Sequence, residues 1–167
     1  MKRFLLPLPL LLACGGSDSG ADPNATMVPV GNAGTMLAAT KEGINAFIAT
    51  NEHRSWIKEP APHESSGPHG MVQSFFNDKY RAARQSGTYP MPVGATSVKE
   101  LFDGTTLDGW AVGIKTKAGD GADTWTWYES FVDELPEVKY FGVANPTCEG
   151  CHEGGASKDR SLTPTVP

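Results

Sequence analysis

Prolines divide the chain beyond residue 60 into segments too short for a bundle of long helices. Proline breaks a helix interior, and seven prolines fall between residues 60 and 146: Pro60, Pro62, Pro68, Pro90, Pro92, Pro136 and Pro146. Several intervening segments alternate apolar and polar residues with the period of a half-buried strand: Met71 to Phe76, Gly94 to Phe102, Trp110 to Ile114 and Trp125 to Phe131. Asp108-Gly109 and Gly119-Asp120-Gly121 are typical of turns between strands. The sequence therefore predicts an α+β fold with an antiparallel sheet as its core.

A few short helices are predicted beside this sheet. The segment from Lys41 to Asn51 places three apolar residues on one helical face, namely Ile44, Phe47 and Ile48. Asn77 is a favoured capping residue, and the helix that it begins should end at Gly87. A further short helix should start near Asn145 and carry the C-terminal cysteines.

The N-terminus has the three parts of an export signal, which are a basic start, an apolar stretch from Phe4 to Leu12 and a small-residue junction. The junction Leu11-Leu12-Ala13-Cys14 resembles the bacterial lipobox, in which the cysteine after the cut becomes an acylated N-terminus. Cys14 is thus predicted to be a lipid anchor that holds the protein in the bacterial periplasm. Gly15 after the cysteine favours the outer membrane. The alternative is a plain secretory signal, with Cys14 free or in a disulfide.

The remaining chain is the size of one domain with a tail. We expect a signal peptide over residues 1–13, a flexible tether rich in Gly, Ser, Asp and Pro over 14–37, and one folded domain over 38–167. The formal charge is −5 and becomes −7 when Lys2 and Arg3 leave with the signal peptide. A negative charge argues against a nucleic-acid partner and leaves the lipid anchor as the only membrane contact.

The C-terminal segment Cys148-Glu149-Gly150-Cys151-His152 has the C-x-x-C-H spacing of a c-type haem attachment site. On one helical turn the two sulfurs lie on the same side as the imidazole, so one segment can hold the macrocycle and supply its axial ligand. We therefore predict one covalent haem c, bound by Cys148 and Cys151, with His152 as the iron ligand. Two alternatives stay open, an exported dithiol or disulfide and half of a zinc site completed by other histidines: His53, His63 and His69.

Only 15 residues follow His152, and none of them is a methionine or histidine. This position excludes the small electron-transfer cytochrome c, whose haem motif lies near the N-terminus and whose methionine ligand lies far downstream. The class of haem protein has to come from the rest of the chain.

A series of short motifs extends over roughly residues 50 to 164. In chain order they are His53-Arg54-Ser55-Trp56, Pro68-His69-Gly70, Phe76-Asn77, Gly94-Ala95-Thr96-Ser97-Val98-Lys99-Glu100, the Trp125 to Phe131 strand, Cys148 to His152, and Asp159-Arg160-Ser161-Leu162-Thr163. In order and spacing, these motifs resemble those of the cytochrome P-460 family and its relative cytochrome c′-beta. The resemblance implies a mono-haem periplasmic protein built on an antiparallel sheet, with a five-coordinate iron that binds small nitrogen species.

In the cytochrome P-460 members, a lysine of the V-K-E strand is cross-linked to the haem and the protein oxidises hydroxylamine. The matching residue is Lys99, which makes it a candidate catalytic residue and a candidate haem cross-link. The alternative reading of Lys99 is a solvated lysine on an edge face. The family also has an arginine and a carboxylate on the distal side of the haem. The arginine aligns near Val72 and the carboxylate near Gly113 or Ile114, so this sequence has neither group at the matching positions.

We therefore expect an apolar distal pocket, with three candidate lining residues: Phe75, Phe76 and Trp110. Such a pocket resembles the c′-beta branch, which binds nitric oxide or carbon monoxide. The predicted function is binding or oxidation of small ligands such as nitric oxide and hydroxylamine, and whether the protein is an enzyme stays open. The alternative is a six-coordinate electron-transfer cytochrome whose sixth ligand is one of five residues: Met71, Met91, His53, His63 or His69. A redox partner protein and a homodimer are both compatible with these readings.

Overall fold

The computed structural model describes residues 24–31, 34–135, 137–163 and 166–167. The predicted signal peptide, its Cys14 and the first part of the predicted tether lie outside the described residues. The later part of that segment is folded and is not a flexible tether, because Met27–Pro29 pairs with Met36–Ala38 and both Val28 and Leu37 are buried in the core. The described chain is an α+β structure with mostly antiparallel pairing, as predicted. Its α-helices are α1 (Lys41–Ala49), α2 (Asp78–Ser86) and α3 (Pro146–His152). In this part of the chain, no helix is long and apolar enough to cross a membrane.

The main sheet has seven strands in the order β3-β5-β6-β7-β8-β9, with β4 also paired to β5. Their bounds are β3 (Ile57–Lys58), β4 (His63–Glu64), β5 (Met71–Phe76), β6 (Thr96–Asp103), β7 (Thr106–Lys115), β8 (Trp125–Phe131) and β9 (Tyr140–Val143). A separate hairpin joins β1 (Met27–Pro29) to β2 (Met36–Ala38). Short 3-10 turns complete the chain at Glu52–Ser55, Ala122–Thr124, Val132–Glu134 and Glu153–Lys158.

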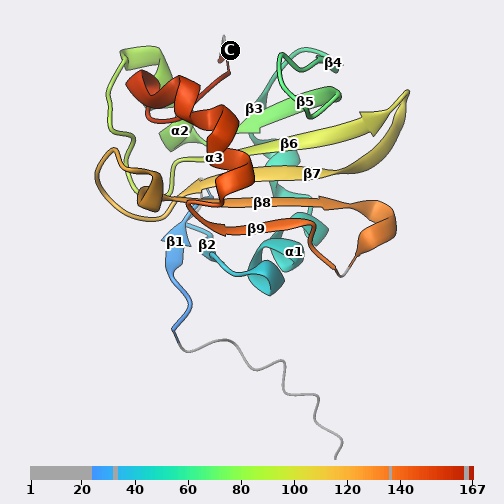
Figure 1. Ribbon diagram of the computed structural model, residues 1–167, viewed down its shortest axis with the longest axis horizontal. Helices are drawn as coiled ribbons and strands as arrows, with labels where there is room; N and C mark the ends of the chain where they lie inside the picture. Colours follow the sequence, from blue (N-terminus) through green and yellow to red (C-terminus); the bar gives the residue numbers. More distant parts are fainter. Residues whose placement is uncertain (1–23, 32–33, 136, 164–165) are drawn as a thin grey trace, which may run out of the picture.

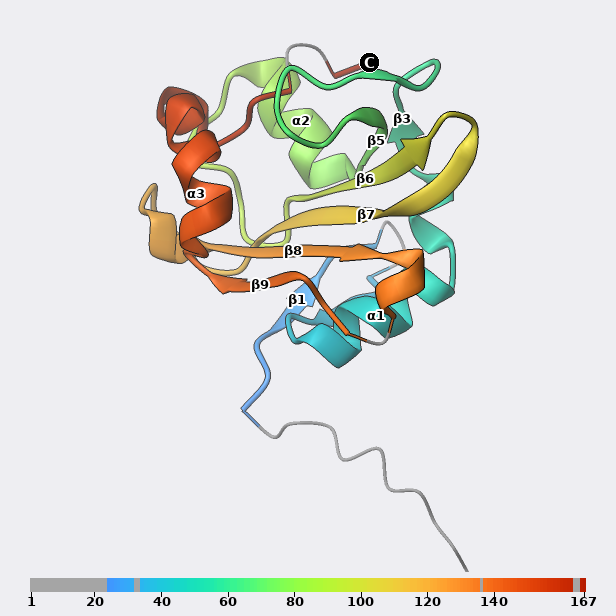
Figure 2. The same cartoon turned by 45° about the vertical axis from the view of Figure 1, so that its right-hand side comes forward.

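Strand alternation gives the sheet two different faces, and each is covered by its own helices. One face contributes Phe75, Val98 and Val112 to a core with α1 and the β1-β2 hairpin. The opposite face contributes Phe76 and Trp127 to a second cluster with α2 and α3. In Figures 1 and 2, α3 runs in front of the strands, whereas α1 lies below them beside β1. The helix α3, which carries the predicted haem motif, and α1 thus lie on opposite sides of the sheet.

The cap predicted at Asn77 is present, and α1 has a cap that was not predicted. Thr40 Oγ1 accepts a hydrogen bond from the Gly43 amide at the start of α1, at 3.1 Å. Asn77 Oδ1 accepts from the Tyr80 and Thr96 amides, both at 3.0 Å, and so joins the start of α2 to β6. Capping satisfies amides that the first helical turn leaves without partners.

The prediction of a turn at Asp108-Gly109 is wrong. The β6-β7 hairpin turns at Gly104, which has a φ of 58°. Leu101 pairs with Gly109 and Phe102 pairs with Leu107, so Asp108 is the extra residue of a bulge inside β7. A Cβ at Gly109 would lie 2.3 Å from the Ser130 carbonyl oxygen. Residue 109 is a glycine because the backbones of β7 and β8 lie too close here for a side chain.

Candidate functional site

Small side chains form a floor on the sheet face beneath α3. Ser97 of β6 pairs with Gly113 of β7, which pairs with Trp127 of β8. Two residues away on the same face of the sheet, Lys99 pairs with Ala111. A Cβ at Gly113 would lie only 2.7 Å from the Trp127 ring, so the glycine lets the indole lie close to the sheet. The floor leaves room between the strands and the elements above them.

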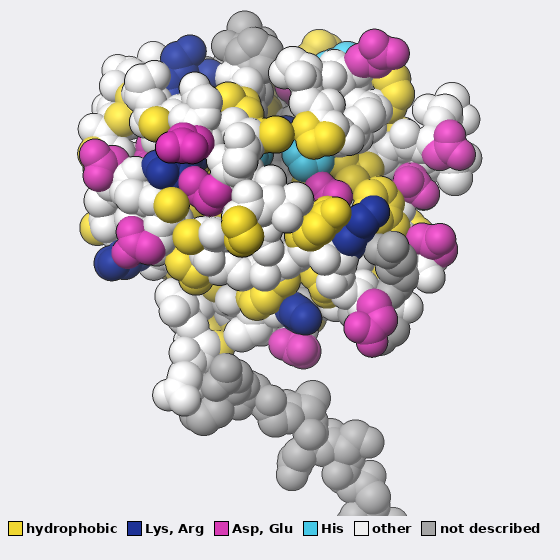
Figure 3. Space-filling model, viewed as in Figure 1, with side chains coloured by type: hydrophobic (Ala, Val, Ile, Leu, Met, Phe, Trp, Pro, Cys, Tyr) yellow, Lys and Arg dark blue, Asp and Glu magenta, His cyan; other side chains and the backbone are white. Residues whose placement is uncertain are grey.

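A cavity of about 260 Å³ lies over this floor, and a second one of about 470 Å³ adjoins it toward the loop that follows β4. Both cavities are lined by His69, Lys99, Cys151 and His152. Cys148 lines the first. In the space-filling view, histidine side chains are visible in the hollow in the middle of this face (Figure 3). The three residues of the predicted haem motif therefore meet at one cavity.

The local sequence of α3 places both cysteines at the cavity wall. Asn145 Oδ1 accepts from the Thr147 and Cys148 amides at 3.1 and 3.4 Å, and Pro146 occupies the first turn, where no amide is needed. Cys148 is half-buried, Cys151 is exposed, and both thiols are free. Burial raises the pKa of the Cys148 thiol to about 11, so that it is protonated near neutral pH.

His152 is held in one tautomer. Its Nδ1 lies 2.8 Å from the Arg160 carbonyl oxygen. Because a carbonyl can only accept, Nδ1 carries the proton and Nε2 keeps its lone pair. Burial lowers the pKa of His152 to about 4, although the hydrogen bond to Arg160 opposes the shift. His152 is therefore a neutral imidazole at neutral pH with Nε2 available to a metal.

A side-chain network ties α3 to the sheet. Trp127 Nε1 donates to Glu149 Oε1 at 2.8 Å, and Arg160 Nε donates to Glu149 Oε2 at 2.6 Å. The Trp127 and His152 rings lie 4.2 Å apart between centroids. Sequence reasoning did not single out Glu149 or Trp127 for these roles, because Glu149 fills a variable position of the motif and Trp127 reads as an ordinary core residue.

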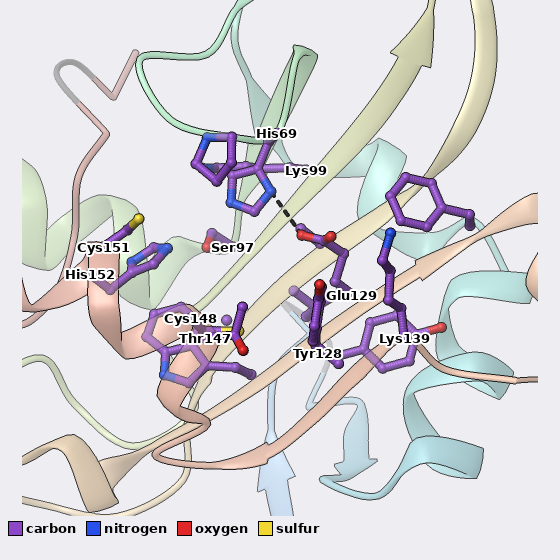
Figure 4. Close-up of a pocket in the computed structure, with 17 residues that line it drawn as sticks. His69, Ser97, Lys99, Tyr128, Glu129, Lys139, Thr147, Cys148, Cys151 and His152 are labelled. Carbon is purple, nitrogen blue, oxygen red and sulfur yellow. Dashed lines mark ion pairs between the residues drawn. The ribbon is translucent and has the colours of Figure 1, made fainter.

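The wall across the cavity from α3 also carries polar groups that the sequence did not predict for this pocket, beside apolar residues such as Ala111 and Phe131. His69 Nδ1 lies 2.9 Å from Glu129 Oε2, and the pair faces the cavity (Figure 4). Lys99 also lines the cavity, and among the described residues it has no hydrogen bond or ion pair. Burial lowers the pKa of Lys99, with Glu59 and Glu129 opposing the shift.

The three aromatic residues expected to line the pocket lie elsewhere. Phe75 and Trp110 face α1, on the side of the sheet away from Lys99. Phe76 shares the face of Lys99 but stacks on Tyr80 of α2, with 5.2 Å between ring centroids. Aromatic residues fill both cores of this protein, so aromatic character alone does not mark the pocket.

Of the five candidate sixth ligands, only two lie at the cavities. His69 lines both, and His63 lines the second, where its Nε2 lies 3.0 Å from Glu59 Oε2. His53 is buried on the α1 side with its Nε2 3.0 Å from Glu100. The other two are Met91, which is buried in the α2 cluster, and Met71, which faces away from the floor.

Two comparisons with known proteins gave no match. No family model matches the chain, and no curated protein matches it. Within the described ranges, no group of three or more His, Cys, Asp and Glu side chains could hold a metal ion by itself. A zinc site completed by other histidines therefore has no ligand set in this part of the protein.

The site does fit a covalently attached haem. A c-type haem needs two thiols and one imidazole nitrogen on a short helix, facing a cavity. Cys148 and Cys151 are free and His152 Nε2 is available. On the sheet side, the cavity is lined by small residues such as Ser97, Ala111 and Gly113. Cys148, Cys151 and His152 could thus hold the group between α3 and the sheet.

Proposed function

We propose that this protein is an exported mono-haem c-type cytochrome whose iron binds a small nitrogen ligand such as nitric oxide or hydroxylamine. Cys148 and Cys151 attach the haem, and His152 is the proximal ligand. The observation that carries the proposal is the 2.8 Å contact between His152 Nδ1 and the Arg160 carbonyl, because it leaves Nε2 of a neutral imidazole beside two free thiols. This is the hydrogen bond that typically fixes the tautomer of a metal-bound histidine.

A bound haem would supply an iron with one open position that can bind a small ligand and exchange electrons. Around that cavity the chain supplies the polar groups His69, Glu129 and Lys99. A carboxylate paired with a histidine can accept or return a proton, and a nearby amine can hydrogen-bond to a polar ligand. This wall supports a polar ligand such as hydroxylamine as well as a gas, and it supports oxidation with an external electron acceptor.

The leader and tether complete the proposal. Acylated Cys14 would anchor the domain to a bacterial membrane on the periplasmic side, with the outer membrane favoured. The oxidising compartment outside the cytoplasm is also the place where haem is joined to C-x-x-C-H motifs. A redox protein in the same compartment would exchange electrons with the haem.

A second candidate, the six-coordinate electron carrier, rests on His69. Its side chain lines both cavities together with His152, and its Nδ1 contact with Glu129 leaves Nε2 without a hydrogen bond in the described structure.

The absorption spectrum of the reduced protein separates these states, since cross-linked, five-coordinate and six-coordinate haems absorb differently. The protein should be produced in a host with haem c maturation and compared with His69→Ala. We expect a five-coordinate spectrum that His69→Ala leaves unchanged. A six-coordinate spectrum that becomes five-coordinate in His69→Ala would establish the electron carrier instead.

A further inference from the structure

A buried ion pair lies directly behind the turn that contacts His152. Lys115, the last residue of β7, points its Nζ at both carboxylate oxygens of Asp159, at 2.8 and 2.7 Å. The Lys115 side chain is fully buried, and that of Asp159 is 1% exposed. A buried pair of this kind persists only when its remaining hydrogen-bonding capacity is satisfied.

Both partners of the pair are satisfied. Lys115 Nζ also donates to Thr124 Oγ1 at 2.8 Å and to the Gly119 carbonyl. Asp159 accepts from Trp125 Nε1 at 3.1 Å and from the Met91 amide at 2.7 Å. Asp159 is therefore fixed by elements from distant parts of the chain.

The residue so fixed belongs to a turn with unusual backbone conformation. Asp159 has a φ of 50° and Arg160 a φ of 65°, so two consecutive residues with a Cβ are left-handed. Such conformations are unfavourable for non-glycine residues and persist where the surroundings impose them. Here the surroundings are the Lys115 contacts on Asp159 and the bond from the Arg160 amide to the Gly155 carbonyl, at 2.9 Å.

The turn directs the Arg160 carbonyl at His152 Nδ1. We infer that Lys115 and Asp159 are positioning residues for the axial ligand: through the left-handed turn, their ion pair fixes the tautomer and ring orientation of His152. This inference rests on the proposed haem and assigns the means by which its iron ligand is tuned. A hydrogen bond from Nδ1–H to a carbonyl makes Nε2 a stronger donor, and a stronger donor favours ferric iron.

The test compares Lys115→Met with Tyr80→Phe. Lys115→Met keeps the length of the side chain but removes the contact with Asp159. Tyr80→Phe removes another buried hydrogen bond to the same C-terminal segment, at Ser161 Oγ, one residue beyond Arg160. The readout is the reduction potential of the haem-loaded protein.

We expect Lys115→Met to weaken ferric relative to ferrous ligation by His152 about tenfold, which raises the potential by about 59 mV. Tyr80→Phe should leave the potential unchanged. An unchanged potential in Lys115→Met, or an equal shift in both variants, would overturn the inference.

A second measurement does not depend on haem, and its first part uses the wild-type chain alone. In the full chain produced without haem maturation, nitrogen NMR of the His152 ring should show the proton on Nδ1. A wild-type ring protonated on Nε2 contradicts the inference even if haem is attached normally. Conversely, a wild-type chain that never acquires haem contradicts the proposed function, while the Nδ1 tautomer and its loss in Lys115→Met would still support the positioning role.

Discussion

His69 Nδ1 and Glu129 Oε2 lie 2.9 Å apart at the wall of the cavity that also receives Cys148, Cys151 and His152. Both side chains are mostly buried, with 17% and 15% exposed. His69 lies in the loop before β5 and Glu129 in β8, so only the fold brings the pair close to Cys148, Cys151 and His152. Together with Lys99 it makes the cavity suitable for ligands that exchange protons.

Glu129→Gln should separate ligand binding from turnover. If Glu129 accepts a proton from a bound ligand, loss of the carboxylate should lower hydroxylamine oxidation by about 10²- to 10⁴-fold, the range typical of general bases. Nitric oxide binding should persist, because it requires no proton transfer. The measurements are steady-state oxidation with an added electron acceptor and a nitric oxide titration of the reduced protein.

The control for this variant is Glu137→Gln, which changes an exposed carboxylate in the loop before β9. It should leave oxidation unchanged. Equal activities in wild type, Glu129→Gln and Glu137→Gln would remove Glu129 from the chemistry.

The amine of Lys99 should be more nucleophilic near neutral pH than that of a solvated lysine. Burial lowers its pKa, so a larger fraction of the amine is neutral near neutral pH than for a solvated lysine. If the amine is bonded to the porphyrin, the Soret band of the reduced protein lies far to the red, and Lys99→Ala restores an ordinary haem c spectrum. Lys139→Ala is the matched control, since Lys139 lines the same cavity but lies over the Phe131 ring, 4.6 Å from its centroid. Identical spectra in all three proteins would show that Lys99 is not cross-linked.

His152 should make the haem-free protein less stable in acid. Its folded pKa of about 4 lies below the ordinary value of 6.5, because burial disfavours the charged ring. Between these values the unfolded chain binds a proton that the folded chain does not, so the free energy of unfolding falls as pH falls from 6.5 to 4. The full effect is roughly 3 kcal/mol. Urea unfolding of wild type and His152→Gln across this window measures it, and parallel pH profiles for the two proteins would contradict the assignment.

The Lys115–Asp159 pair should stabilise the folded protein as well as position the His152 ring. Lys115→Met leaves the Asp159 charge buried without its partner, which typically costs about 3–5 kcal/mol in the free energy of unfolding. Lys117 lies two residues after Lys115 and forms an exposed ion pair with Asp123. Lys117→Met breaks that pair and should change the free energy of unfolding little. Urea denaturation checks both, and similar losses in the two variants would argue against the buried pair as a stabilising contact.

Cys14→Ser tests the lipid anchor. With the lipobox intact, the protein should fractionate with the membrane, and Cys14→Ser should not be acylated. A wild-type protein recovered as a free periplasmic protein would replace the anchor with the plain secretory signal.

The parts of the fold that follow local rules were predictable. Alternation located four of the strands, which are β5, β6, β7 and β8. Asn77 marked the start of α2, and the spacing of Cys148, Cys151 and His152 marked the site residues that the structure brings to one cavity. Lys99 was also identified in advance, through a resemblance, and the structure places it at that cavity. The cross-link and the haem stay predictions.

The parts that depend on pairing between distant segments were not predictable. Asp108-Gly109 has turn residues but forms a bulge, because the register of β7 against β6 decides its role. Glu129 faces the cavity only because it is in register with Ala111, and His69 reaches it through an irregular loop. A single sequence shows neither which face of a strand meets α3 nor which loop covers it.

The intact mass of the denatured protein tests the central claim most directly. After expression in a host with haem c maturation, the wild-type mass should exceed that of the processed chain by one haem, because thioether bonds survive denaturation. The Cys148→Ala/Cys151→Ala double variant should lose that increment. A wild-type mass without the increment, increasing only by two hydrogens on reduction, would contradict the account and identify a Cys148–Cys151 disulfide.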